Sequence, residues 1–300
     1  MRLNKIWGIA LVCGVALAGS AVWAAPYSHD KAMNVAVINN IDIGYVVAGE
    51  VDAPAVMLIM GLTASHRLWP EALVNGLVDA GYRVVLFDNR DTGDSARLDQ
   101  LGTPVLWWEM VKNTLGFDVN APYTLGDMAD DTIGVMDELG IERAHIVGAS
   151  MGGMIAQTLA ARYPERTRSL VSIMSTTGAP HLPEAEDEAG EGLQNLGDSA
   201  GEVAANLRAM GMYPEAMPRQ LMAIIAAGDR TAEVAGIRAP TLVVHGAVDP
   251  LLPLAHGEHT HQTISHSAYE VYAEMAHDFP EDVVPKLVAR MSEFFRNSQN

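Results

Sequence analysis

The feature that most constrains the fold of this chain is a short apolar segment that leads into a serine between two glycines. Residues 144–149 have the pattern of a buried β-strand, Ser150 lies between Gly148 and Gly152, and an apolar helix opens at residues 154–157. A chain that passes directly from strand to helix must reverse sharply, and small residues leave room for that reversal. The pattern predicts that Ser150 lies at the tip of a strained turn, with the N-terminal N–H groups of the helix aimed at the same spot.

The same residue pattern occurs a second time, around Ser199, between Gly197 and Gly201. An acidic stretch at residues 188–195 precedes it, and no strand pattern is present there. This context favours Ser199 or Asp198 as the N-cap of a helix over residues 203–207. For Ser150 the alternatives are an ordinary glycine-rich turn and a phosphate-binding loop, but the sequence contains no Gly-x-x-x-x-Gly-Lys pattern.

The first 24 residues have the three parts of a secretory signal peptide. Arg2 and Lys5 give a positive start, residues 6–22 are almost wholly apolar, and Val22-Trp23-Ala24 precedes a cleavage position at Ala25. We therefore expect a secreted protein, periplasmic or extracellular, with no stable membrane anchor after cleavage. The alternative is an uncleaved anchor. Cys13 is the only cysteine and falls inside this segment, so the mature chain is expected to have no disulfide.

The charge balance is strongly acidic. The chain has 19 Lys and Arg against 37 Asp and Glu, a formal net charge of −18. An acidic surface repels nucleic acid, and no basic cluster of the kind that binds a phosphate backbone is present. Nucleic-acid binding is therefore not expected.

Strand-length apolar runs alternate with helical stretches along most of the chain. After a predicted hairpin around Asn39-Asn40, strands are expected at 55–60, 83–87, 144–149, 170–174, 241–245 and 268–272, with helices at 68–80, 125–139, 151–163 and 283–295. This alternation predicts an α/β fold with a mostly parallel central sheet and helices on both faces. Residues 25–177 and 236–300 would form this core.

Two segments break the alternation. Residues 98–123 contain Trp107, Trp108 and Phe117 without a strand pattern. Residues 178–235 are first acidic and then helical. We interpret 178–235 as an inserted helical cap that walls an apolar pocket, with methionines as adaptable lining, although a plain surface insertion would have the same pattern. The methionines in question are Met210, Met212, Met217 and Met222.

A serine hydroxyl becomes a useful nucleophile only when a base takes its proton, and that base is usually a histidine oriented by a carboxylate. Where the nucleophile lies on a strand–turn–helix motif, the chain order is serine, acid, histidine. Asp249 follows the strand at 241–245, and His277 follows the strand at 268–272. The carboxyl ends of parallel strands meet at one edge of the sheet. Ser150, Asp249 and His277 are thus the predicted catalytic residues.

Two nearby acids are weaker candidates for the catalytic carboxylate. Asp229 lies in a helical pattern, and Asp278 would compete with its neighbour His277 for the same space. His245 lies within a buried strand and is expected to be a core histidine.

Four histidines cluster after Asp249, which invites a metal interpretation. Their spacing does not match a zinc pattern such as His-Glu-x-x-His. We therefore predict neither a metal nor a cofactor. The four are His256, His259, His261 and His266.

The residues around Ser150, Asp249 and His277 resemble the catalytic set of the α/β-hydrolase fold family. Residues 87–95, Phe-Asp-Asn-Arg-Asp-Thr-Gly-Asp-Ser, are similar to the Asp-x-Arg-x-x-Gly-x-Ser stretch that follows a core strand in many members. We interpret that stretch as a structural turn, in which Gly93 allows a tight backbone and Arg90 holds carbonyl or carboxylate groups.

Residues 57–62, Met-Leu-Ile-Met-Gly-Leu, resemble the strand and oxyanion loop of the family, with Met60 where histidine is commoner. The resemblance implies that the backbone N–H groups of Leu62 and Met151 bind the oxyanion. It covers residues 33 to about 297. The sequences of residues 59–62 and 88–93 are similar to those of the subgroup that contains aclacinomycin methylesterase.

These features predict a secreted serine hydrolase that cleaves carboxylic esters of small molecules with an apolar acyl group, through an acyl-enzyme. The serine at position 150 separates the chain from dehalogenases and epoxide hydrolases of this fold, which use aspartate there. Amide hydrolysis of the proline iminopeptidase kind, perhydrolase or cofactor-free haloperoxidase activity, and a non-catalytic ligand-binding role remain alternatives.

Overall fold

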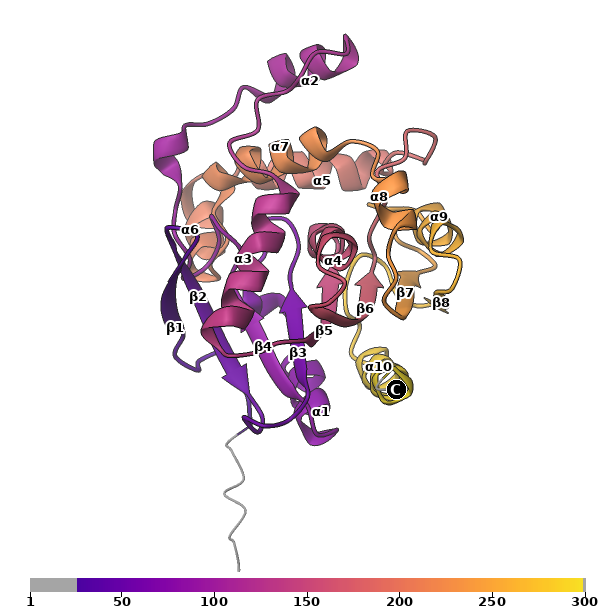
Figure 1. Cartoon of the computed structure of the whole chain (residues 1–300). Coiled ribbons are helices and arrows are strands. Elements are labelled where there is room, and N and C mark those ends of the chain that lie inside the picture. Colours follow the sequence, from indigo (N-terminus) through magenta and orange to yellow (C-terminus); the bar gives the residue numbers. More distant parts are fainter. Residues whose placement is uncertain (1–25, 299–300) are drawn as a thin grey trace, which may run out of the picture.

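The central element is an eight-stranded, mostly parallel sheet. The computed structural model describes residues 26–298, so the predicted signal peptide lies outside the described residues. The strand order is β1-β2-β4-β3-β5-β6-β7-β8, in which the β1–β2 and β2–β4 pairs are antiparallel and the others parallel (Figure 1). The strands are β1 (Asn34–Ile38), β2 (Ile41–Ala48), β3 (Ala55–Ile59), β4 (Arg83–Phe87), β5 (Ala144–Ala149), β6 (Thr167–Ile173), β7 (Thr241–Gly246) and β8 (Ala268–Tyr272).

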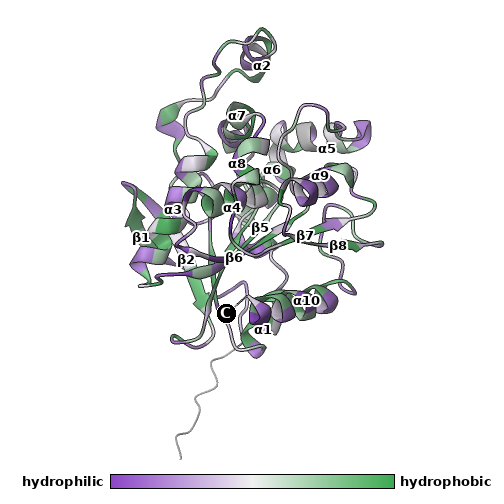
Figure 2. Cartoon of the chain, turned by 45° about the vertical axis from the view of Figure 1, so that its right-hand side comes forward, coloured by the Kyte–Doolittle hydropathy of each residue, from purple (hydrophilic) through white to green (hydrophobic). Residues whose placement is uncertain are grey.

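Helices cover both faces of this sheet, as predicted. One hydrophobic core lies between the sheet and α1 (Glu71–Asp79) with α10 (Val284–Asn297), and the other lies between the sheet and α3 (Leu125–Glu138) with α4 (Met151–Arg162). The central strands carry mainly hydrophobic residues, as strands buried on both faces should (Figure 2). Helix α9 (Ala255–Thr263) connects β7 to β8.

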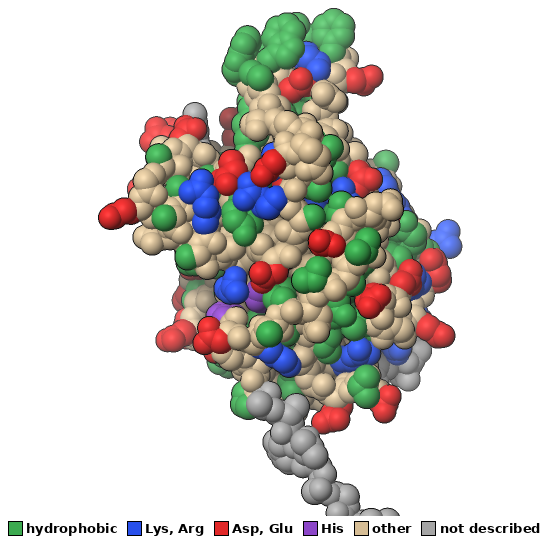
Figure 3. All heavy atoms as spheres, turned by 90° about the vertical axis from the view of Figure 1, so that its left-hand side faces the viewer, with side chains coloured by type: hydrophobic (Ala, Val, Ile, Leu, Met, Phe, Trp, Pro, Cys, Tyr) green, Lys and Arg blue, Asp and Glu red, His purple; other side chains and the backbone are tan. Residues whose placement is uncertain are grey.

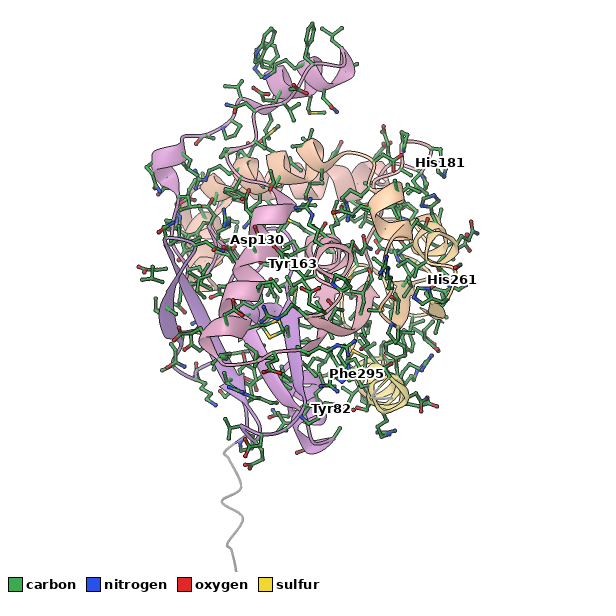
Figure 4. All side chains as sticks on the ribbon, in the orientation of Figure 1. Tyr82, Asp130, Tyr163, His181, His261 and Phe295 are labelled. Atoms are coloured by element: carbon green, nitrogen blue, oxygen red, sulfur yellow. The ribbon has the colours of Figure 1, made fainter. Side chains whose placement is uncertain are left out.

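Side-chain pairs tie the helices to their neighbours. The Tyr163 hydroxyl, at the end of α4, donates to Asp130 Oδ1 of α3 over 2.6 Å. On the opposite face, the rings of Tyr82 and Phe295 pack edge to face with centroids 5.3 Å apart, which joins the start of β4 to α10 (Figure 4). These contacts hold the helices of each layer against their neighbours in the fold.

Most local predictions agree with the structure. Asn39 and Asn40 have φ values of 51° and 65°, as a tight hairpin turn requires. Thr124 and Asp127 form a capping box at the start of α3. The helix predicted from residue 68 instead begins at Glu71, because His66–Leu68 form a separate 3-10 turn, η1, and Pro70 precedes the first helical turn.

The segment between β6 and β7 consists of helices. They are α5 (Asp187–Gly197), α6 (Gly201–Ala209), the 3-10 turn η3 (Pro214–Ala216), α7 (Met217–Ala227) and α8 (Thr231–Ala235). Figure 1 shows α5 and α7 beyond the ends of the strand arrows. Helix α8, within the predicted insertion, packs against α4 and α9 of the body.

Residues 98–123 form an arm that stands away from the body (Figure 1). The arm starts with the 3-10 turn η2 (Asp99–Leu101) and carries α2 (Leu106–Thr114) at its tip. Among the described residues, no helix has both the length and the apolar character needed to cross a bilayer.

Candidate active site

Ser150 lies at the predicted sharp turn between β5 and α4. Its backbone has φ 56° and ψ −124°, a strained conformation of the kind found at functional sites. The two glycines are needed for close approach: a Cβ at Gly148 would collide with the carbonyl of Gly152, and one at Gly152 with the carbonyl of Ile59. The turn therefore holds the serine where the ends of β5 and β3 meet.

The structure brings Ser150, His277 and Asp249 into one chain of hydrogen bonds. His277 Nδ1 donates to Asp249 Oδ2 over 2.8 Å, and the Ser150 hydroxyl lies 2.9 Å from His277 Nε2. Since the carboxylate only accepts, Nδ1 carries the ring proton and Nε2 is free to accept from serine. This is the arrangement that general-base activation of a serine requires.

Asp249 is itself held in place. Its carboxylate is fully buried, and Oδ1 accepts the backbone N–H groups of Leu251 and Leu252, each over 2.9 Å. His245, buried in β7 as predicted, donates from Nε2 to the Leu252 carbonyl over 2.7 Å. The loop after β7 thus leaves only Oδ2 for His277.

The loop after β3 lies directly against Ser150. A methyl group added at Gly61 would be 3.0 Å from Ser150 Cβ. Neither the Leu62 nor the Met151 N–H donates to another described backbone group, which is what an oxyanion site needs. The next residue, Thr63, has φ 56°, an uncommon value for a β-branched residue.

Gln220 of α7 fixes this loop and was not predicted from the sequence. Its side chain is fully buried, and Oε1 accepts the Thr63 N–H over 2.6 Å. Its Nε2 donates to the Arg90 carbonyl and the Thr92 hydroxyl, each over 2.9 Å. The available signal was Arg219-Gln220, an isolated polar pair in an apolar helix.

The turn at residues 88–95 has the structural role that the sequence suggested. Arg90 forms a two-point ion pair with Asp131 of α3, at 2.7 and 2.8 Å. Arg219 binds both oxygens of buried Asp91 at 2.7 and 2.8 Å, and these hydrogen bonds raise the pKa of its guanidinium. Helix α7 is therefore anchored to the body beside the site.

A cavity of about 540 Å³ opens onto Ser150 and His277. The prediction that cap methionines line it was correct only for Met212. Met222 is fully buried, Met217 packs at Gly197 of α5, and Met210 is exposed. The cavity is lined mainly by apolar side chains, including Met60, Leu62, Leu68, Met151, Met154, Met174, Met212, Leu221, Ile224, Leu251, Leu252 and Phe279.

The weaker candidates lie elsewhere or make local contacts. The predicted N-cap role of Ser199 or Asp198 is wrong: the N-cap residue of α6 is Ala200, and the Ser199 hydroxyl donates to the Asn195 carbonyl at the end of α5. Asp229 lies in the loop before α8, not in a helix, and accepts from Thr231. Asp278 is exposed at the cavity rim and accepts the Ala276 N–H.

The four clustered histidines bind four different partners. They are His256 on the Thr176 hydroxyl, His259 on the Thr177 hydroxyl, His261 on the Ser267 hydroxyl and His266 on the Ala239 carbonyl. Within residues 26–298, no group of three or more metal-ligating side chains comes together.

Residues 54–211 match the sequence model of the α/β hydrolase fold family. The match covers more than half of the 300 residues, so the chain belongs to this family. The enol-lactonase structure from Burkholderia xenovorans LB400 superposes with a TM-score of 0.66 at 23% identity, over 88% of this chain and 100% of that one.

Two curated sequences show what the chain is similar to. It is 36% identical over 123 residues to rhodomycin D methylesterase DauP of Streptomyces sp. (strain C5), covering 41% of this chain. The match spans only 35% of the length of that relative. It is 29% identical over 239 residues to putative carbamate hydrolase RutD of Variovorax paradoxus (strain S110), covering 70% of this chain and 79% of the other.

Proposed function

We propose that this chain is a serine hydrolase that cleaves carboxylic esters of small molecules. The observation that carries the proposal is the hydrogen-bond chain from Asp249 through His277 to Ser150 at the mouth of an apolar cavity. The similarity to a methylesterase and the enol-lactonase fold support ester chemistry.

In this mechanism Ser150 Oγ attacks the ester carbonyl while His277 Nε2 takes its proton. The Leu62 and Met151 N–H groups stabilise the oxyanion, and Asp249 stabilises the charged imidazole. When the intermediate collapses, the leaving alcohol takes the proton from His277 and the acyl group stays on Ser150. Water, deprotonated by His277, then releases the acid.

The cavity indicates the substrate. An apolar lining favours an apolar acyl group, because its burial contributes about 25 cal/mol per Å².

We also propose export, which rests on the N-terminal pattern of residues 1–24. N-terminal sequencing of exported protein should begin at Ala25, and an intact Met1 would contradict cleavage.

A matched substrate panel tests the reaction class. Methyl esters, anilides and carbamates that share one hexanoyl-sized apolar group should be compared by kcat/KM, together with labelling by a fluorophosphonate. We expect the esters to be turned over fastest and one serine to be labelled. Faster anilide or carbamate cleavage would reassign the bond, and absence of labelling would favour a ligand-binding role.

Gln220 should position the oxyanion loop. In Gln220→Met, Thr63 loses its acceptor and can relax from its positive φ, which would move the adjacent Leu62 N–H. We expect kcat to fall about 10-fold with KM nearly unchanged. This corresponds to a rise of ~1.4 kcal/mol in the activation free energy, caused by one misplaced hydrogen-bond donor. Steady-state kinetics on one ester would measure this.

Gln157→Met is the matched control. Gln157 is equally buried, on α4, and bonds Ser172 and Arg230 instead of the loop. The kcat of Gln157→Met should stay near that of the unmodified protein, even if its thermal stability falls by as much as that of Gln220→Met. An equal fall in kcat for both variants would mean that Gln220 acts only through stability.

A further inference from the structure

The arm presents a concentrated apolar surface to solvent. Half of the sixteen exposed large hydrophobic residues in the described chain fall between residues 101 and 117. Trp107, Leu115 and Phe117 are each about two-thirds exposed, at 67%, 66% and 64%. Figure 3 shows hydrophobic side chains gathered at the tip of the projection. The full set is Leu101, Val105, Trp107, Trp108, Met110, Val111, Leu115 and Phe117.

The two charged side chains of helix α2 are paired with each other. Glu109, although on the projecting helix, is only 8% exposed. Its Oε2 accepts Lys112 Nζ over 2.6 Å and the Asn120 N–H over 2.9 Å. The charges of helix α2 are thus satisfied by each other and by the loop that follows the helix, while its apolar side chains face outward. Between residues 101 and 119, Asp118 is the only other charged residue.

Both ends of the arm are fixed to one buried carboxylate. Asp91 Oδ1 accepts the Leu98 N–H, and Asp91 Oδ2 accepts the Tyr123 hydroxyl, each over 2.8 Å. Arg219 pairs with Asp91 and also donates to Asp99 and the Gly102 carbonyl. The arm is therefore held in place at its base, on the side of the molecule where the strands end (Figure 1).

The shape and size of the tip distinguish between occupants. Helix α2 has nine residues, so it is about 14 Å long and ~10 Å wide, and it offers a few hundred Å². A stable dimer usually buries about 800 Å² per partner, so tip-to-tip contact between two copies is too small. A lipid surface needs no matching groove, and it favours Trp, Phe and Leu at its boundary.

The charge distribution selects the kind of lipid. The chain carries a net charge of −18, and the arm tip has no excess of Lys or Arg. Anionic headgroups would repel it, whereas zwitterionic headgroups would not. We propose that residues 101–117 dock into the surface of a zwitterionic lipid layer. Docking there turns the strand-end side of the molecule, which contains the cavity, toward the lipid. The binding step itself does not depend on the proposed hydrolase activity.

The test compares two triple variants in a vesicle flotation assay. Trp107→Ser, Trp108→Ser and Phe117→Ser are combined in the arm variant. The control variant combines Val35→Ser, Val37→Ser and Val51→Ser, whose side chains are 58%, 75% and 66% exposed outside the arm. All three proteins are purified with the same N-terminus, verified by mass spectrometry, so any contribution of residues 1–25 is equal.

With phosphatidylcholine vesicles, the arm variant should bind at least about 10-fold more weakly than the unmodified protein, and the control variant should bind like it. Adding phosphatidylglycerol should not strengthen binding. Equal binding of the arm variant, or no binding by the unmodified protein, would overturn the proposal. A dimer that sedimentation detects in the unmodified protein but not in the arm variant, without lipid binding, would assign the arm to a second copy.

Discussion

Replacing Ser150 with alanine should lower kcat for ester hydrolysis by about 10⁴- to 10⁶-fold while leaving the fold and the cavity intact. The acyl-enzyme cannot form without Oγ, and what remains is the modest acceleration that the oxyanion donors give to direct attack by water. The turn should keep its conformation, because alanine is smaller than serine and the backbone of residue 150 is set by Gly148 and Gly152. Single-turnover release of a nitrophenol measures the loss.

Ser199→Ala is the matched control because it changes the serine of the other Gly-x-Ser-x-Gly sequence. Its hydroxyl makes one local hydrogen bond to Asn195, at the end of α5. Activity should stay within about twofold of the unmodified protein, as for most surface substitutions. Loss of activity in Ser199→Ala with retention in Ser150→Ala would reverse the assignment of the nucleophile.

The sequence was informative about this site because the chemistry depends on local order. A strand, a glycine-bounded serine and a helix occupy residues 144–162 as one continuous pattern, and they fold as β5, the turn and α4. Asp249 and His277 each follow a buried or half-buried strand, so parallel pairing of β6, β7 and β8 sets them beside Ser150. Periodicity detects such strands well, since it reports burial on the faces of one sheet.

What the sequence did not predict depends on contacts between distant segments. Gln220 reaches Thr63 across 157 positions, and no local pattern encodes that hydrogen bond. Met217 and Met222 were expected at the cavity, but Met217 packs at Gly197 of α5 and Met222 is fully buried away from the cavity, an outcome set by tertiary contacts. The projection of residues 98–123 was not predicted for a related reason: α2 is apolar on its outer side, and pattern analysis assigns apolar residues to the interior.

Replacing Asp249 with asparagine should lower kcat by about 10⁴-fold with little change in KM. The backbone N–H groups of Leu251 and Leu252 would retain the amide oxygen at the present position of Oδ1. The amide nitrogen then occupies the Oδ2 position and presents an N–H to His277 Nδ1. Nδ1 must accept, so the ring proton moves to Nε2, which can no longer take the proton of Ser150. Shape is preserved and only the tautomer is wrong.

Asp278→Asn separates this explanation from a general loss of negative charge near His277. Asp278 is adjacent to His277 in sequence and lies at the cavity rim, but its carboxylate is exposed and accepts only the Ala276 N–H among described groups. Its kcat should change less than about fivefold, since exposed charges are screened by water. If Asp278→Asn lost activity and Asp249→Asn kept it, the acid would be misassigned. If both lost activity equally, the field of the two carboxylates, and not the tautomer, would control His277.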